Sequence, residues 1–516
     1  MDGYLDLFMF AALMAAILLG FPVAFCISGV AIVFAYLGWA LGVMDISLLG
    51  ATSQRIFGLL SNNVLIAIPI FVLMGAVLEK SRIAEELLDT MGRLFGQLRG
   101  GLGISVVLVG ALLAASTGIV GATVVAMGMI ALPTMLRTGY DPKVASGIVC
   151  TAGTLGQIIP PSTLLIILAD VMSNSYQQAQ YEQGKFAVEA LSVGQFFAAA
   201  MLPGLLLVLL YLVYILILGV IRPKSMPPAP AELEKPSTKK IASTIVPPVL
   251  LIIAVLGAIL GGVATPTEAA SVGAIGAVLV AGVRIGVHPR TILVGVAALA
   301  LVGILAGLFP VRLQRNDLGL GSWILGSSYI VLVLLGAVAI VLAVKELIVK
   351  RVMVEAVTST MTMTAMIFAT ILAAGIFSLV FVGLGGEERI AYILTNMPGG
   401  ASAALVFCLA FVFILGFFLD FVEISVILLP LIVPPLIIMG HDPIWLGILL
   451  AINLQISFLT PPFGFSLFYL RGAAPPQVST GQIYAGVMPF IALQILGMLA
   501  IYLLPQVSTW LPRLLF

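Results

Sequence analysis

The chain has 516 residues, of which 61% are hydrophobic and only 9% are charged, and its formal net charge is +1. Soluble domains carry about 25% charged residues, so this composition excludes an ordinary water-soluble fold and predicts an all-α protein that crosses the membrane many times. Nucleic acid is not an expected partner, because no long basic run is available to neutralise phosphates. The lipid bilayer is the expected surroundings.

Residues that bind metals or form disulfides are few and scattered. The three cysteines lie far apart in apolar runs, and the two histidines lie near the ends of such runs. This pattern does not fit a zinc site, haem ligation or a disulfide framework. The sequence also contains no phosphate-binding loop, metalloprotease helix or nucleophile elbow. We therefore expect neither an enzyme nor an ATPase, and no organic or haem cofactor.

Apolar stretches long enough to cross a bilayer, about 20 residues each, begin near residue 5. The stretch 55–79 has polar residues at its middle, which predicts a re-entrant hairpin. The stretch 101–135 is rich in small and hydroxyl residues near its centre, which predicts a broken helix. A helix over 143–170 follows and contains Pro160-Pro161, a pair that removes two backbone donors.

A polar linker over 222–242, rich in proline and basic residues, separates residues 1–221 from residues 243–516. The second part contains two extra apolar helices at about 290–345, which have no counterpart in the first part. Its remaining predicted elements are a hairpin over 355–384, a broken helix over 402–437 and a Pro-Pro helix over 443–470.

The two parts share a pattern of proline and glycine. The pattern of the first part, Pro133, Gly139-Tyr140-Asp141-Pro142 and Pro160-Pro161, recurs 301 positions later as Pro434, Gly440-His441-Asp442-Pro443 and Pro461-Pro462. Chance supplies one or two such matches in a membrane chain, but hardly all of them. Because internal duplications in transporters are often inverted in the membrane, we predict an inverted repeat with two re-entrant hairpins and two broken helices.

Polar residues at the predicted hairpin tips and helix breaks are candidate ligands. Unwound backbone survives in lipid only where protein or water satisfies it. Hydroxyls, amide oxygens and freed carbonyls suit sodium, and helix N-termini attract anions. The candidate binding residues are Ser61, Asn62, Asn63, Ser116, Thr117, Gly118, Thr123, Thr358, Ser359, Thr360, Thr362, Thr364, Gly416, Asp420 and Glu423. The candidate helix-breaking residues are Pro160, Pro161, Ser162, Thr460, Pro461 and Pro462.

Several of these residues also have a plainer interpretation. Ser and Thr often pack membrane helices together, and a proline pair kinks a helix without binding anything. Asp420 and Glu423 either couple ions, as intramembrane carboxylates often do, or form hydrogen bonds that hold a helix break. Glu268 follows Pro266 and is expected to cap a helix N-terminus. Asp170 is expected at the membrane interface.

Charge does not fix the membrane orientation. Cytoplasmic loops are usually enriched in Lys and Arg. Three predicted crossings separate the basic segment 80–99 from the basic linker 222–240, so the two are expected on opposite sides, although both are basic.

Several motifs of this sequence resemble those of a known family, the large membrane subunit of tripartite ATP-independent periplasmic (TRAP) transporters, or DctM-like proteins. The resemblance covers nearly the whole chain except 222–240 and about 290–345. It rests on Ile68-Pro69, Ala131-Leu132-Pro133 with Gly139-Tyr140, Ile159-Pro160-Pro161-Ser162, Thr265-Pro266-Thr267-Glu268-Ala269-Ala270, Leu415-Gly416 with Asp420, and Thr460-Pro461-Pro462.

The resemblance implies a sodium-coupled importer of organic acids, mostly carboxylates, in the bacterial inner membrane. It implies an elevator mechanism, in which a body of two hairpins and two broken helices moves against a scaffold. Sodium would be the coupling ion. The implied partners are a small four-helix membrane subunit (DctQ-like) and a soluble periplasmic substrate-binding protein (DctP-like).

By the same likeness, the first hairpin would open to the cytoplasm and the second to the periplasm. Sodium ligands would fall where the 61–63 tip meets the 116–118 break, and where the 358–364 tip meets the 416–420 break. The stretch Ala114-Ala115-Ser116-Thr117-Gly118 departs from the alternating Ser and Gly of the family, so it offers fewer hydroxyls.

Two other functions are compatible with parts of the pattern. A stand-alone sodium-carboxylate symporter of similar fold would need no partner subunits. A membrane subunit of a proton-pumping respiratory complex is more remote, because the buried Lys and Glu relays or haem histidines that it requires are not evident.

Overall fold

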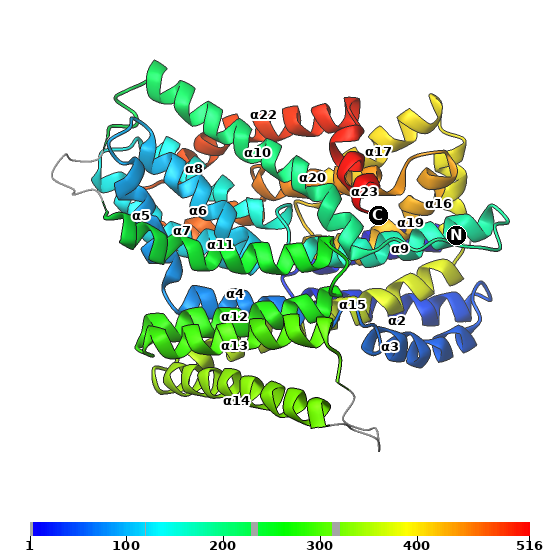
Figure 1. The fold of residues 1–516 in the computed structure, drawn as a ribbon. Helices are drawn as coiled ribbons and strands as arrows, with labels where there is room; N and C mark the ends of the chain where they lie inside the picture. Colours follow the sequence, from blue (N-terminus) through cyan, green and yellow to red (C-terminus); the bar gives the residue numbers. More distant parts are fainter. Residues whose placement is uncertain (1–3, 119, 229–235, 312–319) are drawn as a thin grey trace.

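The computed structural model describes residues 4–118, 120–228, 236–311 and 320–516, and leaves the side chains of 114–117 and 320 undescribed. The described chain is helical throughout and has no strand (Figure 1). The helices up to the linker are α1 (Leu5–Leu18), α2 (Val23–Ala40), η2 (Ile46–Ala51), α3 (Thr52–Leu60), α4 (Ala67–Lys80), α5 (Ile83–Phe95), α6 (Gly101–Thr117), α7 (Val120–Arg137), α8 (Pro142–Thr154), η3 (Leu155–Gln157), α9 (Thr163–Glu182) and α10 (Val193–Ile221). The helices after it are α11 (Thr238–Leu260), α12 (Pro266–Ile285), α13 (Pro289–Leu308), α14 (Leu320–Val349), α15 (Val352–Gly383), α16 (Gly386–Thr395), α17 (Gly400–Leu415), α18 (Phe421–Glu423), η4 (Ile424–Leu428), α19 (Leu429–Ile438), α20 (Pro443–Leu459), α21 (Phe465–Ala473), α22 (Thr480–Leu503) and α23 (Gln506–Leu515).

Ten of the described helices are long and apolar enough to cross a membrane. Large apolar side chains are exposed along them, among them Phe25 on α2 and Val220 on α10. A helix satisfies its own backbone hydrogen bonds, which lipid cannot do, so exposed apolar faces on helices of this length are what a bilayer requires. The predicted class, an all-α multi-pass membrane protein, is confirmed.

The predicted second hairpin, 355–384, is wrong. These residues lie almost entirely in α15, one unbroken helix. The threonine hydroxyls that prompted the prediction bond to carbonyls of their own helix: Thr360 Oγ1 donates to Ala356 O at 2.8 Å and Thr362 Oγ1 donates to Thr358 O at 3.0 Å. A hydroxyl that is satisfied in this way leaves the helix intact, and α15 contains no proline that would interrupt it.

The predicted first hairpin, 55–79, does not fold back either. Residues 61–66 form a turn between α3 and α4, but both helices pack along α15 instead of against each other. Figure 1 shows α3 and α4 toward opposite ends of the same layer. The 301-residue spacing pairs Ser61–Asn63 with Thr362–Thr364, so two helices separated by a turn in the first half correspond to one continuous helix in the second.

The segment predicted as the first broken helix, 101–135, instead folds back on itself. Gly110 on α6 packs against Ala152, and Val124 on α7 packs against Gly153. A straight helix would separate positions 110 and 124 by about 21 Å. Both contact neighbouring residues of α8, so α6 and α7 form a hairpin with its tip near Gly118. We call it hairpin 1.

The equivalent segment of the second half, 402–437, also folds back. Helix α17 ends at Leu415, residues 416–420 are non-helical, and α19 packs back against α17. We call α17 to α19 hairpin 2. At the base of hairpin 2, His441, which follows α19, contacts the start of α17, with its Nε2 3.1 Å from Ala401 O.

The two Pro-Pro helices are interrupted rather than kinked. Helix α8 passes through η3 and the turn at 158–162 before α9 begins, and α20 stops at Leu459 before α21 begins at Phe465. The Pro160-Pro161 and Pro461-Pro462 peptide bonds are both cis. Each half therefore contains one hairpin followed by one broken helix.

The basic segments at 80–99 and 222–240 lie at the same end of the bundle, so the expectation of opposite sides is wrong. Glu86 on α5 pairs with Lys240 at 3.7 Å and with Arg284 at 2.5 Å. The Asp141 amide, at the base of hairpin 1, donates to Ser225 O at 3.0 Å. Hairpin 1 begins and ends at the same end of the bundle, so it is not a crossing. Two crossings instead of the predicted three therefore separate the two basic segments, which places both at the same end.

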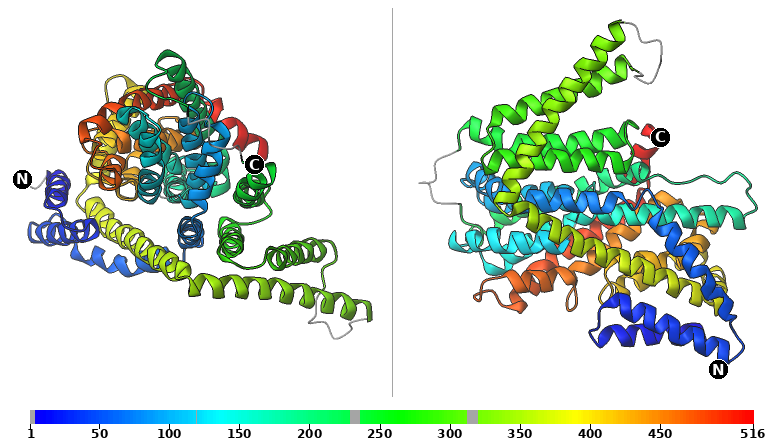
Figure 2. Two further views of the ribbon diagram at one scale, coloured as in Figure 1. Left: turned by 90° about the vertical axis from the view of Figure 1, so that its left-hand side faces the viewer. Right: turned by 90° about the horizontal axis from the view of Figure 1, so that it is seen from below.

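The extra segment forms α13 and α14, which lie on the outer side of the bundle (Figures 1 and 2). They pack closely on each other, with Gly295 against Ala339 and Gly336 against Leu299. Helix α12 packs on α4 much as α2 packs on α15. The contacts thus make α12 the counterpart of α2, and α13 and α14 an addition to the second half.

Candidate functional site

The tip of hairpin 1 touches the Pro-Pro break of its own half. Gly118 has φ of +61°. A Cβ at this position would lie 2.9 Å from Thr163 Oγ1 and 3.0 Å from Thr163 N. Glycine is the residue that takes this left-handed conformation without cost and leaves room for so close an approach. The sequence thus allows the tip to sit directly on the first turn of α9.

The tip of hairpin 2 makes the equivalent contact. The rings of Phe418, at the tip, and Phe463, just after the second Pro-Pro pair, have centroids 5.7 Å apart. Gly416 packs against Ser457. Phe463 lies 301 positions after Ser162, so corresponding breaks meet corresponding tips in the two halves.

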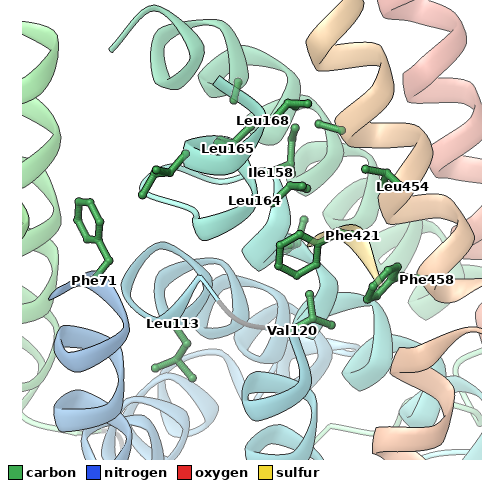
Figure 3. Close-up of a cluster of buried hydrophobic side chains, with 14 of the residues drawn as sticks. Phe71, Leu113, Val120, Ile158, Leu164, Leu165, Leu168, Phe421, Leu454 and Phe458 are labelled. Carbon is green, nitrogen blue, oxygen red and sulfur yellow. The ribbon is translucent and has the colours of Figure 1, made fainter. Parts of the chain in front are cut away.

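The halves also meet each other at the centre. Hairpin 2 packs on α9 through α19, and hairpin 1 packs on α21 through α7. Gln455 Nε2 donates to Thr154 Oγ1 at 3.5 Å, and these two residues are 301 positions apart. A contact between equivalent positions is what an internal two-fold axis produces. Buried apolar side chains from both halves form one cluster, which includes Val120, Leu164, Phe421 and Phe458 (Figure 3).

Several buried polar atoms around these breaks have no protein partner. Both side-chain polar atoms of Gln157 are unpartnered although the residue is 1% exposed. The others near the breaks are Thr163 Oγ1, Thr151 Oγ1, Gln455 Oε1, Glu423 Oε2 and Ser425 Oγ. Buried polar groups are nearly always hydrogen-bonded, so these unpartnered atoms, which are mostly oxygens, suit bound ions, water or a polar solute.

Asp420 and Glu423 stand at the start of the helical arm that returns from the tip of hairpin 2. The Asp420 carboxylate caps α18 by accepting from the Phe421 amide at 2.7 Å. Glu423 is 6% exposed, and its Oε2 has no partner. One Asp420 oxygen thus holds the start of α18, and Glu423 has an oxygen without a protein partner.

The helix-breaking residues fall where they were predicted. Ser162 caps α9 by accepting from the Leu165 amide at 3.5 Å, and its Oγ also donates to Gln157 O at 2.7 Å. Thr460 ends α20, with its Oγ1 donating to Ile456 O at 2.7 Å. Pro462 O accepts from the Tyr484 hydroxyl at 2.9 Å. These contacts fix both breaks.

The other predicted residues divide into two groups. Gly118 and Gly416 lie at the hairpin tips, and Thr123 is buried on α7. The side chains of Ser116 and Thr117 are outside the described part of the chain. The residues that do not lie at a tip are Ser61, Asn62 and Asn63 in the α3–α4 turn, and Thr358, Ser359, Thr360, Thr362 and Thr364 within α15.

The α3–α4 turn connects instead to the surrounding helices. Asn62 Nδ2 donates to Asp170 Oδ1 on α9 at 2.9 Å, and Asn63 O accepts from Thr267 Oγ1 on α12 at 2.7 Å. The expected cap by Glu268 is present, since its Oε2 accepts from the Thr265 amide at 2.8 Å.

Sequence reasoning missed Gln157, Thr163, Gln455 and Ser425. Two signals could have found Gln157 and Gln455. The first signal is that both residues are amides within long apolar runs, and the second is that each lies within six residues of a Pro-Pro pair.

Two interlocked hairpins and two broken helices around buried unpartnered polar atoms, inside a multi-pass helical bundle, define a membrane transport protein. Residues 10–307 and 318–507 match the family described as "Tripartite ATP-independent periplasmic transporter, DctM component", and the chain belongs to that family. It is therefore a TRAP large permease subunit and a multi-pass protein of the inner membrane.

Several relatives resemble the chain over nearly its full length. The C4-dicarboxylate TRAP transporter large permease protein DctM of Vibrio cholerae is 29% identical, covering 98% of this chain and 97% of the relative. The ectoine TRAP transporter large permease protein TeaC of Halomonas elongata is 24% identical, covering 98% and 99%. The sialic acid TRAP transporter large permease protein SiaM of Vibrio cholerae is 24% identical, covering 96% and 95%.

A solved structure shares the fold. The Alcanivorax borkumensis YdaH transporter aligns with a TM-score of 0.52 and 15% sequence identity, covering 90% of this chain and 87% of that chain.

Proposed function

We propose that this permease uses a sodium gradient to import an organic acid, which a periplasmic substrate-binding protein delivers. The observation that carries the proposal is the contact of each hairpin tip with the broken helix of its own half, beside buried polar atoms that have no partner. The relatives named above act on C4-dicarboxylates, ectoine and sialic acid. All three kinds of molecule carry a carboxylate, so a carboxylate is the proposed common feature of the substrate.

Sodium is the proposed coupling ion because the unpartnered atoms are mainly oxygens. Hydroxyl, amide and carboxylate oxygens are hard ligands, and broken transmembrane helices offer freed carbonyls beside them. The proposed sodium-binding regions are the 116–118 tip with the start of α9, and the 416–420 tip with Glu423. The α3–α4 turn and the threonines of α15 are no longer part of this proposal.

An elevator movement is proposed for the two hairpins and two broken helices. These elements pack on one another across the two halves, through α19 on α9 and α7 on α21. They form the proposed moving body, and α2, α3, α4, α12 and α15 form the proposed scaffold. The partners proposed for the complete transporter are a small four-helix membrane subunit and the periplasmic binding protein.

The central test is uptake into proteoliposomes that contain the permease with its small subunit. With the binding protein present outside and an inward sodium gradient, uptake of a radiolabelled carboxylate is expected, and replacing sodium by potassium is expected to abolish it. Sodium-independent uptake would contradict the coupling. Full uptake without the binding protein would favour the stand-alone symporter instead.

The distribution of charge supports an orientation with hairpin 1 open to the cytoplasm. Cytoplasmic ends are rich in Lys and Arg. The end where hairpin 1 opens is basic and carries Arg99, Arg137, Lys143, Arg222, Lys224, Lys240 and Arg284. The end where hairpin 2 opens has fewer basic residues, Lys185, Arg389 and Arg513, beside the acidic residues Glu182, Glu189, Glu387, Glu388 and Asp442.

Cysteine labelling checks this orientation. Lys185→Cys and Glu388→Cys are expected to react with a membrane-impermeant maleimide added to cells with a permeabilised outer membrane. Lys143→Cys and Lys224→Cys are expected to react only in inside-out vesicles. The three native cysteines are buried, so the unmodified protein provides the background. The reverse pattern would invert the proposed orientation.

A further inference from the structure

A cavity of about 230 Å³ lies apart from the hairpin tips, between the proposed scaffold and the proposed moving body. Helices α3 and α15 form one wall, and α9 with the η4–α19 segment forms the other. Its polar lining includes Thr52 and Arg55 on the first wall, and Asp170, Asn174 and Gln178 on the second. No function described above uses this cavity.

The two charged groups of the lining face the same space without pairing. Arg55 Nη1 donates to the carbonyl of Gly375 on α15 at 3.2 Å, and Asp170 Oδ1 accepts from Asn62 at 2.9 Å. No salt bridge joins Arg55 to Asp170 in the described chain. Glu387, at the start of α16, lies near enough to act on the charge of Arg55, but its Oε1 accepts from Gln178 Nε2.

The two charges make the cavity selective. The Arg55 guanidinium offers paired N–H donors that match a carboxylate, and the amides of Asn174 and Gln178 supply neutral donors. Asp170 offers only acceptor oxygens when ionised. A dianion would bring a second carboxylate toward Asp170, which is unfavourable, whereas a cationic nitrogen would be attracted to it. Specificity often rests on such a repulsive element.

We propose that this cavity is a binding site for a zwitterionic organic acid, held by its carboxylate at Arg55 and by its cationic nitrogen at Asp170. The inference rests on the proposed function, since it names the class of organic acid that the permease accepts. It also gives the cavity a place in transport. A ligand held between the two walls contacts both the moving body and the scaffold.

Direct binding to the purified permease and small subunit in lipid nanodiscs tests the site. Ectoine serves as the zwitterionic probe and succinate as the dianionic probe, each measured by calorimetry without the binding protein. Ectoine is expected to bind more tightly than succinate. Arg55→Gln and Asp170→Asn are each expected to weaken ectoine binding at least about tenfold, since each removes a charge-assisted hydrogen bond to the ligand.

The two variants are expected to differ in their response to succinate. Asp170→Asn removes the repulsion and should strengthen succinate binding, whereas Arg55→Gln should not. Lys185→Ala and Glu388→Gln serve as matched controls, because they remove exposed charges outside the cavity, and they should bind both probes as the unmodified protein does. Melting temperatures of all variants establish that they are folded.

Two results would overturn the proposal: tighter binding of succinate than of ectoine by the unmodified protein, or unchanged ectoine affinity in folded Asp170→Asn. Failure of this inference is distinct from failure of the proposed function. Sodium-driven uptake by the unmodified transporter tests the proposed function, and it is measured without any change to the cavity.

Discussion

Replacing Gly118 by valine is expected to abolish the proposed sodium-driven uptake while the protein remains folded in the membrane. The left-handed backbone at this position, with φ of +61°, costs an L-residue about 1–2 kcal/mol, and more for a β-branched one. The new Cβ would also lie 3.0 Å from the backbone nitrogen of Thr163. Because a backbone atom cannot swing aside as a flexible side chain can, the hairpin tip must retreat from the start of α9.

The measurement for Gly118→Val is the initial rate of uptake in proteoliposomes, with the reconstituted amount of protein held equal. Gly257→Val on α11 is the matched control, since its Cβ would meet no atom within 4 Å and its backbone is helical. We expect the control to transport at the normal rate. Normal uptake by Gly118→Val would show that the tip contact is not required for transport.

Gly147→Leu is expected to cause the largest loss of stability. Gly147 on α8 and Gly486 on α22 face each other so closely that a Cβ on Gly147 would overlap the Gly486 carbonyl oxygen. A Cβ on Gly486 would in turn overlap the Lys143 carbonyl oxygen. Small residues let membrane helices approach in this way. Overpacking costs roughly 1–3 kcal/mol even in soluble cores, and here two backbones must separate.

The melting temperature of the purified protein in detergent, followed with the amount of protein in the membrane, measures this effect. The control is Gly303→Leu on α13, where an added Cβ meets nothing within 4 Å. The Gly147 variant should melt well below the unmodified protein and accumulate poorly. The Gly303 control should melt and accumulate as the unmodified protein does. Equal melting of the two variants would contradict the close packing of α8 on α22.

The repeat spacing was the most informative signal in the sequence. It predicted both Pro-Pro breaks, because proline removes backbone donors wherever it stands, but the two segments that fold back, 101–135 and 402–437, were predicted as broken helices and not as hairpins. Polar content was a poorer guide. The threonines of α15 predict a hairpin tip, but a hydroxyl on a helix can donate to a carbonyl one turn earlier, so its presence does not imply unwinding.

Contacts between distant segments could not be predicted from single positions. Gln157 and Gln455 carry no motif, and only folding places them beside the hairpin tips. The pairing of Glu86 with Lys240 and Arg284 likewise needed the knowledge that 101–137 returns to its starting side. One error, counting that hairpin as a crossing, produced the wrong expectation about charge.

The two halves differ in one pair of equivalent segments, α3–α4 in the first half and α15 in the second. This difference limits how symmetrical transport can be. An inverted pair of identical units could pass between inward-open and outward-open forms by exchanging shapes, which would make the two forms equal in energy. In this chain, helices α3 and α4 are separated by a turn at 61–66, whereas their counterpart α15 is one continuous helix. Because the two segments differ in structure, the inward-open and outward-open forms are not equivalent, and we expect the resting population to be biased toward one of them before any substrate arrives.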